Sequence, residues 1–181
     1  AYPTLDNIFE TLPSFLDLSA EKLDWLKEEE LRLEKNWSRM NPRYESRIVT
    51  TRSTHGRILF ISDMYLPGKF LEENLRDKGI LAASDTLYLS NREKAGKGDG
   101  SLYSEVLKKQ NLAASALTHH GNCPKSDVEA PQKLGIRTMP YPEGNLTDWE
   151  CFLVAYSDST DGLASLWAGA SRRARCSLPE G

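Results

Sequence analysis

The stretch RILFISDMYLP, residues 57–67, constrains the fold of this chain more than any other. Its apolar residues 58–61 are followed at once by polar residues and a Pro-Gly turn. A short, continuous apolar run of this kind predicts a strand buried on both faces, as in a parallel sheet. Ser62 and Asp63 then stand at the carboxyl end of the strand, where open α/β sheets bind their ligands.

The segments after this strand alternate between two patterns. Apolar runs predict strands over 86–90, 116–119 and 136–139, and helical spacing predicts helices over 70–78, 101–110 and 127–134, the last capped by Ser126. A polar, glycine-containing loop is expected over 91–100. Alternating strands and helices favour a parallel sheet with right-handed crossovers. The predicted fold class is therefore α/β: a Rossmann-like parallel sheet with flanking helices.

Helical patterns flank this core on both sides. Pro13 closes a first helix, Ser19 can cap a second, and Asn41-Pro42 is expected to end the second helix. A further helix is expected over 43–53. We therefore expect a helical segment and possible cap at 1–53, an α/β core at 54–142 and a helical tail at 143–181. The acidic run 28–30 is interpreted as a solvated helix face.

Composition excludes several classes of protein. The net charge is −3 and the isoelectric point about 5.7, which gives no support for nucleic-acid binding. The sequence has no apolar stretch of membrane-spanning length and no signal peptide. Three scattered cysteines suit a reducing compartment. We therefore expect a cytoplasmic protein, and the missing initiator Met suggests a segment of a longer chain.

Three of the predicted strands carry polar groups where they end. These are Ser62-Asp63, the loop that contains Lys97, and the segment 122–127. Because the carboxyl ends of parallel strands share one edge of a sheet, these groups are expected to lie close together. A hydroxyl before a helix N-terminus suits a phosphate. Taken alone, Ser62 and Asp63 favour an ordinary strand end with a capped turn. Without the neighbouring GDGSLY, Lys97 would be interpreted as a solvated loop lysine.

These motifs, in this order, resemble the haloacid dehalogenase-like (HAD) superfamily. A bacterial subgroup has a strand end that reads SDMYLP, followed by S-x-x-x-x-x-x-K-x-x-G-S-L-Y/F and H-x-G-D-N-x-x-S-D-V. Here the later pieces read SNREKAGKGDGSLY and HHGNCPKSDVEAPQKLGI. The resemblance covers residues 57–142 and implies a HAD-like fold.

The resemblance also implies roles for particular residues. Ser62 would bind phosphoryl oxygens, and Lys97, with Lys94 as the alternative, would neutralise charge on the phosphate. Asp127 and Asn122 would belong to a loop that holds Mg²⁺. The implied activity is Mg²⁺-dependent hydrolysis of a small phosphomonoester through an aspartyl-phosphate.

Two departures from the family pattern bear on activity. The nucleophile motif, similar to FDVFDTL, is absent, and LDNIFETL at residues 5–12 fits an amphipathic helix instead. Asn122 stands where the family has Asp, and a neutral amide holds Mg²⁺ less well. In a second alignment Asp63 is the nucleophile, but Tyr65, with a pKa of about 10, then occupies the acid/base position. The predicted phosphohydrolase is therefore truncated or degenerate.

Two other functions remain open from the sequence. The chain could be a non-catalytic HAD-like module of a larger protein, such as a glycosyltransferase-linked or polysaccharide-biosynthesis protein. The basic tail, with Arg172, Arg173 and Arg175, would suit a junction to another domain. A nucleotide-binding Rossmann protein is a weaker alternative, because no G-x-G-x-x-G follows any predicted strand.

Overall fold

The structure is a computed structural model that describes residues 2–177, and for residue 43 the backbone only. The chain forms two compact units. The first comprises Ala1–Met40 and Thr51–Asn111, and the second Asn41–Thr50 and Leu112–Gly181. Helix α3 (Pro42–His55) contributes residues to both. The division into segments 1–53, 54–142 and 143–181 stays a prediction, and its residues 1 and 178–181 lie outside the described part.

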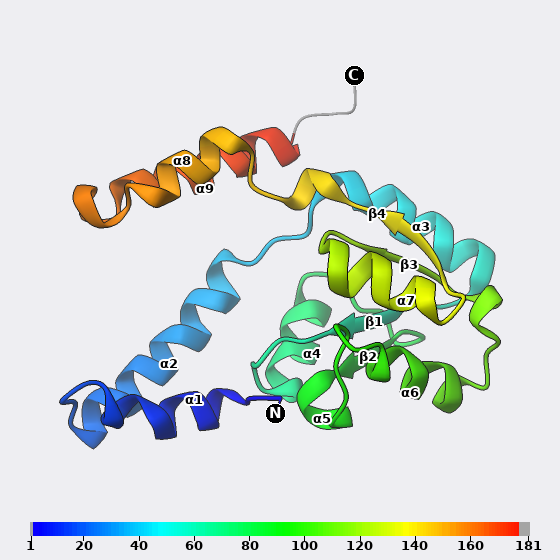
Figure 1. The fold of residues 1–181 in the computed structure, drawn as a ribbon, viewed down its shortest axis with the longest axis horizontal. Helices are drawn as coiled ribbons and strands as arrows, with labels where there is room; N and C mark the ends of the chain where they lie inside the picture. The colour runs from blue at the N-terminus through cyan, green and yellow to red at the C-terminus, as the bar shows by residue number, and fades with distance from the viewer. Residues whose placement is uncertain (1, 178–181) are drawn as a thin grey trace. The chain divides into compact units, whose positions relative to one another are not determined.

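The first unit combines helices with a parallel strand pair (Figure 1). Its elements are α1 (Leu5–Thr11), η1 (Leu12–Ser14), α2 (Ala20–Trp37), β1 (Leu59–Ser62), α4 (Gly68–Asp77), β2 (Thr86–Leu89), α5 (Ser90–Glu93) and α6 (Ser101–Gln110). Strands β1 and β2 run parallel, with Leu59 opposite Thr86 and Ser62 opposite Leu89. Both strands therefore end at the same edge of the pair.

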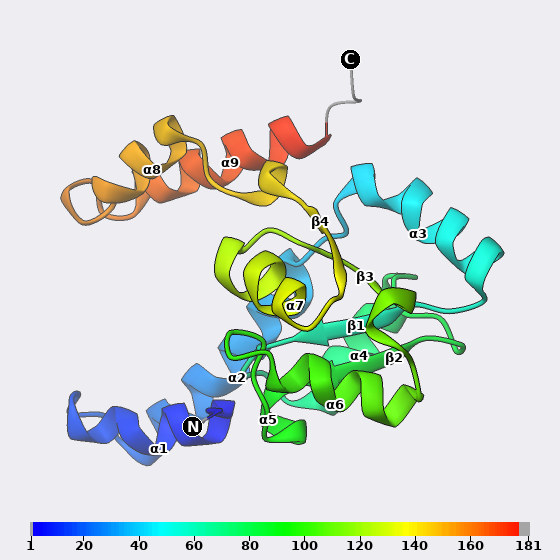
Figure 2. The same ribbon diagram turned by 45° about the vertical axis from the view of Figure 1, so that its right-hand side comes forward.

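The core of the first unit forms where α6 packs on this strand pair. Leu102 and Val106 of α6 are fully buried against Tyr88 of β2, and Leu59 and Ile61 of β1 pack on the same cluster. Figures 1 and 2 both show α4 on the other side of the strands. Helices on both faces explain why β1 is a continuous apolar run rather than an alternating one.

The second unit repeats the parallel strand pairing and ends in a helical hairpin. Its elements are β3 (Thr118–Gly121), η3 (Pro124–Glu129), α7 (Ala130–Lys133), β4 (Arg137–Pro140), η4 (Pro142–Gly144), α8 (Asp148–Ala155), η5 (Asp158–Thr160) and α9 (Leu163–Ser177), with η2 (Ala114–Ala116) before them. Thr118 lies opposite Arg137, and Gly121 opposite Pro140. Gly162, with a φ of 84°, turns the chain between α8 and α9.

The α/β class predicted from the sequence is confirmed, and three local predictions are wrong. Helix α2 ends at Trp37, before the expected Asn41-Pro42, and the helix predicted over 43–53 begins at Pro42, because a proline suits the first turn of a helix. Ser126 caps no helix, since Pro124 already begins η3. The expected loop over 91–100 begins inside the short helix α5. Each error concerns where a helix begins or ends.

Hydropathy along the helices gives a further result. Over residues 2–177, no helix is both long enough and apolar enough to cross a bilayer.

Candidate functional site

The loops that follow β1 and β2 are joined to each other by hydrogen bonds. Asp63 Oδ1 accepts a hydrogen bond of 3.1 Å from the backbone N–H of Lys97. Asn91 Nδ2 donates one of 3.5 Å to the backbone oxygen of Met64. Two segments that are 27 to 34 residues apart in the sequence therefore meet at the strand ends, as the parallel pairing predicts.

Ser62 lies at the last position of β1, with a half-buried side chain. Its Oγ accepts a hydrogen bond of 3.2 Å from the backbone N–H of Met64, which turns the chain out of the strand. A serine hydroxyl that accepts such a bond keeps its own hydrogen for donation. Ser62 thus serves the strand end and can still donate to an anion.

The loop that carries Lys97 is held by its own polar groups. Ser101 Oγ accepts a hydrogen bond of 2.9 Å from Gly96 N–H, and Gly100 N–H donates one of 3.0 Å to Lys97 O. Lys97 is half-buried. Lys94 is exposed and ends α5 in the left-handed region, with a φ of 54°. Of the two candidate lysines, Lys97 is therefore the one bonded to the loop after β1.

Tyr65 connects the loop after β1 to the N-terminal helices. Its hydroxyl donates a hydrogen bond to Glu30 of α2, and its backbone oxygen accepts one of 2.8 Å from Leu5 N–H. The bond to Glu30 is the main reason why the pKa of Tyr65 rises to about 12, and partial burial adds to it. Glu30 is thus half-buried and bonded, although the sequence predicted an ordinary solvated face for its acidic run.

The raised pKa of Tyr65 predicts a loss of stability in alkali. The folded state favours the neutral phenol, with a pKa of about 12 against an ordinary 10.0. The stabilisation that the neutral Tyr65 hydroxyl gives to the folded state is therefore complete below about pH 10. It is lost as the pH rises through 12. Glu30→Gln should remove this part of the pH dependence of the unfolding free energy, measured in denaturant between these pH values. Glu28→Gln, at an exposed position of the same helix, should leave it in place. An unchanged profile in Glu30→Gln would contradict the assignment.

The loop after β3 is organised around Asp127 in the second unit. Asp127 is 4% exposed, and its Oδ1 lies 3.0 Å from His119 Nε2. Its Oδ2 accepts a hydrogen bond of 3.1 Å from Cys123 N–H. A Cβ atom at Gly121 would lie 2.4 Å from the Asp127 side chain, so only glycine fits there. The buried carboxylate therefore closes the loop on itself.

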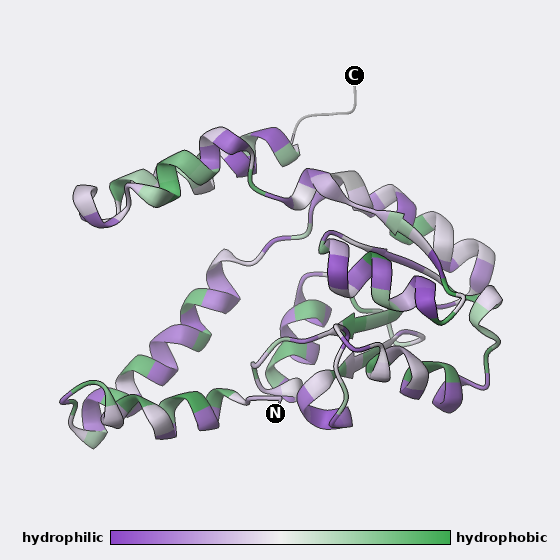
Figure 3. Ribbon diagram, in the orientation of Figure 1, coloured by the Kyte–Doolittle hydropathy of each residue, from purple (hydrophilic) through white to green (hydrophobic). Residues whose placement is uncertain are grey.

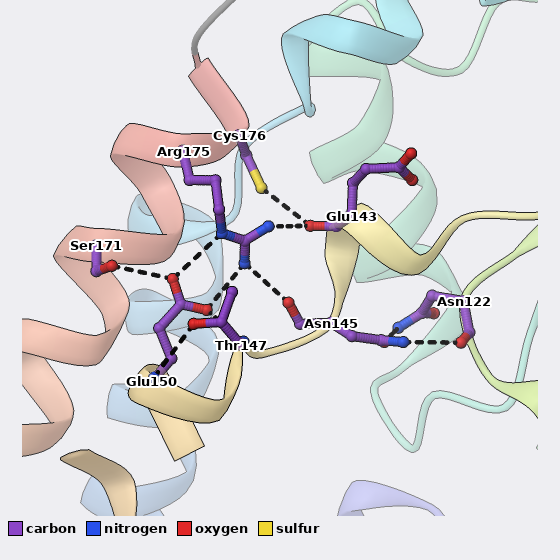
Figure 4. Close-up of polar contacts among 8 residues, drawn as sticks. All are labelled: Asn122, Glu143, Asn145, Thr147, Glu150, Ser171, Arg175 and Cys176. Atoms are coloured by element: carbon purple, nitrogen blue, oxygen red, sulfur yellow. Dashed lines mark hydrogen bonds and ion pairs between the residues drawn. The ribbon is translucent and has the colours of Figure 1, made fainter. Parts of the chain in front are cut away.

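Asn122 contacts the segment after β4. Its Nδ2 donates a hydrogen bond of 2.6 Å to Asn145 Oδ1, and Asn145 Nδ2 donates one of 3.2 Å to Asn122 O. Figure 4 shows how Arg175 continues these contacts by donating to the backbone oxygens of Asn145 and Glu143, at 2.8 and 2.7 Å. Asn122 thus belongs to a network that ties the end of α9 to the strand loops.

Asn122 and Asp127, as they lie in the second unit, form a poor site for a divalent cation. Both oxygens of Asp127 already accept hydrogen bonds, and Asn122 is a neutral amide. In the part of the chain that the structure describes, no three His, Cys, Asp or Glu side chains form a group able to hold a metal. Asp127 is thus the charged oxygen donor of the two residues, and its oxygens already contact His119 and the backbone of Cys123.

The structure thus brings together part of the predicted site. Ser62, Asp63 and Lys97 belong to the first unit, whereas Asn122 and Asp127 belong to the second. Sequence reasoning missed Glu30, Asn91 and His119. His119 could have been found because it lies on the strand that precedes Asp127, but no local pattern marks Glu30 as a partner of a residue 35 positions away.

Comparison with known proteins adds evidence on the fold. No family profile matches the chain, and a search of curated proteins finds no match. Among solved structures, the chain is similar to a 2-haloacid dehalogenase from Pseudomonas syringae pv. Tomato DC3000, with a TM-score of 0.57 and 20% sequence identity. The likeness covers 80% of this chain, which spans about 60% of the length of the dehalogenase. At this identity the likeness concerns the fold alone, and the fold of the chain is HAD-like.

Proposed function

We propose that this chain carries the phosphate-binding part of a HAD-like phosphohydrolase of the SDMYLP subgroup, acting on a small phosphomonoester. The observation that carries the proposal is the hydrogen bond of 3.1 Å between Asp63 and the backbone of Lys97. This bond holds the loop after Ser62 and the loop that contains Lys97 together at one end of the parallel strand pair, where α/β folds bind ligands.

The chemistry of such a site needs donors and positive charge more than reactive groups. A transferring phosphoryl group spreads negative charge over its equatorial oxygens. Ser62 Oγ–H would donate to one of these oxygens, and the ammonium of Lys97 would neutralise their charge. Donors that are already held in place cost little reorganisation at the moment of reaction. The hydrogen bonds within both loops provide that preorganisation.

The nucleophile is the part of the proposal that this chain supplies least well. If Asp63 attacked, the acid/base position two residues later would be Tyr65. The Tyr65 hydroxyl donates to Glu30 and its pKa is about 12, which is far from the pH at which a general acid or base works well. Asp6, in the segment with a passing likeness to the nucleophile motif, lies on α1 and forms an ion pair with Lys27. We therefore expect little or no turnover from residues 1–181 alone.

The Mg²⁺ requirement implied by the family resemblance stays a prediction. By the resemblance, Asp127 would supply a carboxylate oxygen to the ion and Asn122 a carbonyl oxygen. Because both Asp127 oxygens already accept hydrogen bonds, no catalytic step is assigned to this ion. Phosphate binding measured with Mg²⁺ and with a chelator tests the requirement directly.

Lys97→Ala should weaken the binding of inorganic phosphate roughly ten- to hundredfold, since a hydrogen bond to a charged group contributes about 1.5–3 kcal/mol. Lys94→Ala is the matched control, because Lys94 is exposed and at the end of α5, and it should change affinity less than about twofold. Titration calorimetry of the full chain with inorganic phosphate gives the affinities. Equal losses in the two variants would contradict the role of Lys97.

The same preparations test catalysis. Hydrolysis of p-nitrophenyl phosphate should stay near the rate of the uncatalysed reaction. Turnover that Asp63→Asn abolishes would overturn our assignment and make Asp63 the nucleophile. Phosphate binding without turnover is the expected result.

A further inference from the structure

The α8–α9 hairpin presents an exposed apolar face. Six large apolar side chains of the hairpin are each between 50% and 70% exposed: Trp149, Phe152, Tyr156, Leu163, Leu166 and Trp167. Figure 3 shows the hairpin green over its middle and purple towards the end of α9. Soluble domains rarely leave so many large apolar side chains together in water, and such patches mark interaction surfaces.

The six side chains lie in two stripes, one on α8 and one on α9, and these two helices pack against each other. On α8, Trp149 stacks on Phe152 with ring centroids 5.5 Å apart, and Phe152 contacts Tyr156 at 4.8 Å. On α9, the helical spacing of 163, 166 and 167 places these residues on one stripe, away from the buried Ala164 and Ala168. Each helix thus uses one face to hold the hairpin together and another to expose apolar surface.

The two ends of this face carry opposite charge. Asp158 and Asp161 are exposed at the turn of the hairpin. Arg173, also exposed, lies near the other end of α9, seven residues after Leu166 and so on the same stripe. Asp148 is an exposed acidic residue at that end, where it opens α8, and Arg175 is bonded to Glu150. The apolar stripe of α9 is therefore continued by the basic Arg173 at one end, and it meets the acidic Asp158 and Asp161 at the other.

We propose that this face pairs with the same face of a second copy, with the two hairpins antiparallel in a four-helix arrangement. A twofold axis near Trp167 would bring Arg173 of each copy to the acidic turn of the other. The same ion pair would then form twice in the dimer. The acidic turn disfavours an anionic lipid surface, whereas it complements Arg173. The four exposed aromatic side chains alone would bury roughly 500 Å² per copy, against about 800 Å² for a standard interface.

The first test is the oligomeric state of the full chain, measured by analytical ultracentrifugation from micromolar to hundred-micromolar concentration. The wild type should form dimers in this range, and Trp167→Glu should stay monomeric with an unchanged helical circular-dichroism signal. A wild type that stays monomeric throughout, or a Trp167→Glu variant that still dimerises, would overturn the proposal.

Charge reversal gives the second, sharper test. Arg173→Glu should raise the dimer dissociation constant roughly tenfold, because it places like charges at both ends of the interface. Adding Asp158→Lys to the same chain should restore the affinity. Arg172→Glu is the matched control, since Arg172 is exposed on α9 but lies off the apolar stripe, and it should have little effect. Equal effects of the two arginine variants, no rescue, or binding of the monomer to phosphatidylserine vesicles would each count against self-pairing.

Discussion

Glu150→Ala should lower the free energy of unfolding of the second unit by about 3 kcal/mol, the loss typical of a buried ion pair that keeps one partner. Glu150 is fully buried in α8. Its carboxylate accepts hydrogen bonds from Arg175 Nη2 at 2.8 Å, from Ser171 Oγ at 3.0 Å and from Thr147 N–H at 2.9 Å (Figure 4). Alanine would remove this carboxylate from the guanidinium of Arg175.

The effect should extend beyond the hairpin. Arg175 also donates to the backbone oxygens of Glu143 and Asn145, in the segment that follows β4. Loss of Glu150 should therefore loosen the connection between α9 and the strand loops as well as the contact between α8 and α9. Denaturant unfolding measures the total loss, and hydrogen exchange of the α8 and α9 amides shows where protection falls.

The same pair sets a pH dependence. The hydrogen bond from Arg175 is the main reason why the pKa of Glu150 falls from 4.5 to about 2. A carboxyl group with a lowered folded-state pKa stabilises the fold above its ordinary pKa, and this contribution is lost as the pH falls from 4.5 towards 2. Glu150→Ala should lack that acid-dependent part. Asp148→Asn, at the exposed first position of α8, is the matched control and should cost less than about 1 kcal/mol. Similar losses in both variants would contradict the prediction.

Asp85→Ala should destabilise the first unit by a similar amount, about 3 kcal/mol, because it removes a buried carboxylate with several partners. The side chain of Asp85 is fully buried. Its Oδ1 accepts a hydrogen bond of 2.8 Å from Ile58 N–H, and its Oδ2 accepts bonds of 2.9 Å from Ala82 N–H and from Arg52 Nε. Asp85 thus fixes the chain just before β1 and just before β2.

The electrostatics of Asp85 follow from two opposed effects. Burial acts to raise its pKa, but the hydrogen bonds from Arg52 and from the two backbone N–H groups outweigh burial and hold the pKa below its usual range. The carboxylate therefore stays charged at neutral pH. Asp85→Asn keeps the shape of the side chain but removes the charge that faces Arg52. Its free energy of unfolding should therefore lie between those of the wild type and Asp85→Ala.

Denaturant unfolding of the full chain measures the loss in both Asp85 variants. The matched control is Asp77→Asn, because Asp77 is exposed and lies 3.5 Å from Lys35 in a surface ion pair. Surface pairs contribute between about 0 and 1 kcal/mol, so the control should change little. If Asp85→Ala unfolds at the same denaturant concentration as the wild type, Asp85 does not stabilise the segments that precede β1 and β2.

Much of the fold could be predicted from the sequence because helices and strands follow local rules. The apolar run before Ser62 forms β1, and the spacing after Ser101 forms α6. Ser19 caps α2 by accepting a hydrogen bond from Lys22 N–H, as its residue type suggests. Gly79, with a φ of 69°, follows the end of α4. Each of these features depends on residues within four positions of one another.

For the candidate site, the sequence could predict only the positions of residues that follow directly from the pairing of the strands. Parallel pairing of β1 with β2 brings Ser62 and the Lys97 loop to one edge, and this followed from the alternating pattern. The partner of Tyr65 did not follow, because Glu30 lies in an acidic run whose members look alike in the sequence. Nothing local distinguishes the glutamate that faces a tyrosine from its neighbours that face water.

By itself, therefore, the sequence determined the order and type of the elements, the α/β class and the polar residues at the strand ends. Only the tertiary structure decided which buried and half-buried charges have which partners: Asp85 with Arg52, Glu30 with Tyr65, and Glu150 with Arg175. The physical reason is the range of the interactions. Caps and periodicity act over a few residues, whereas a buried charge is stabilised by whichever partner the whole fold brings within hydrogen-bond distance.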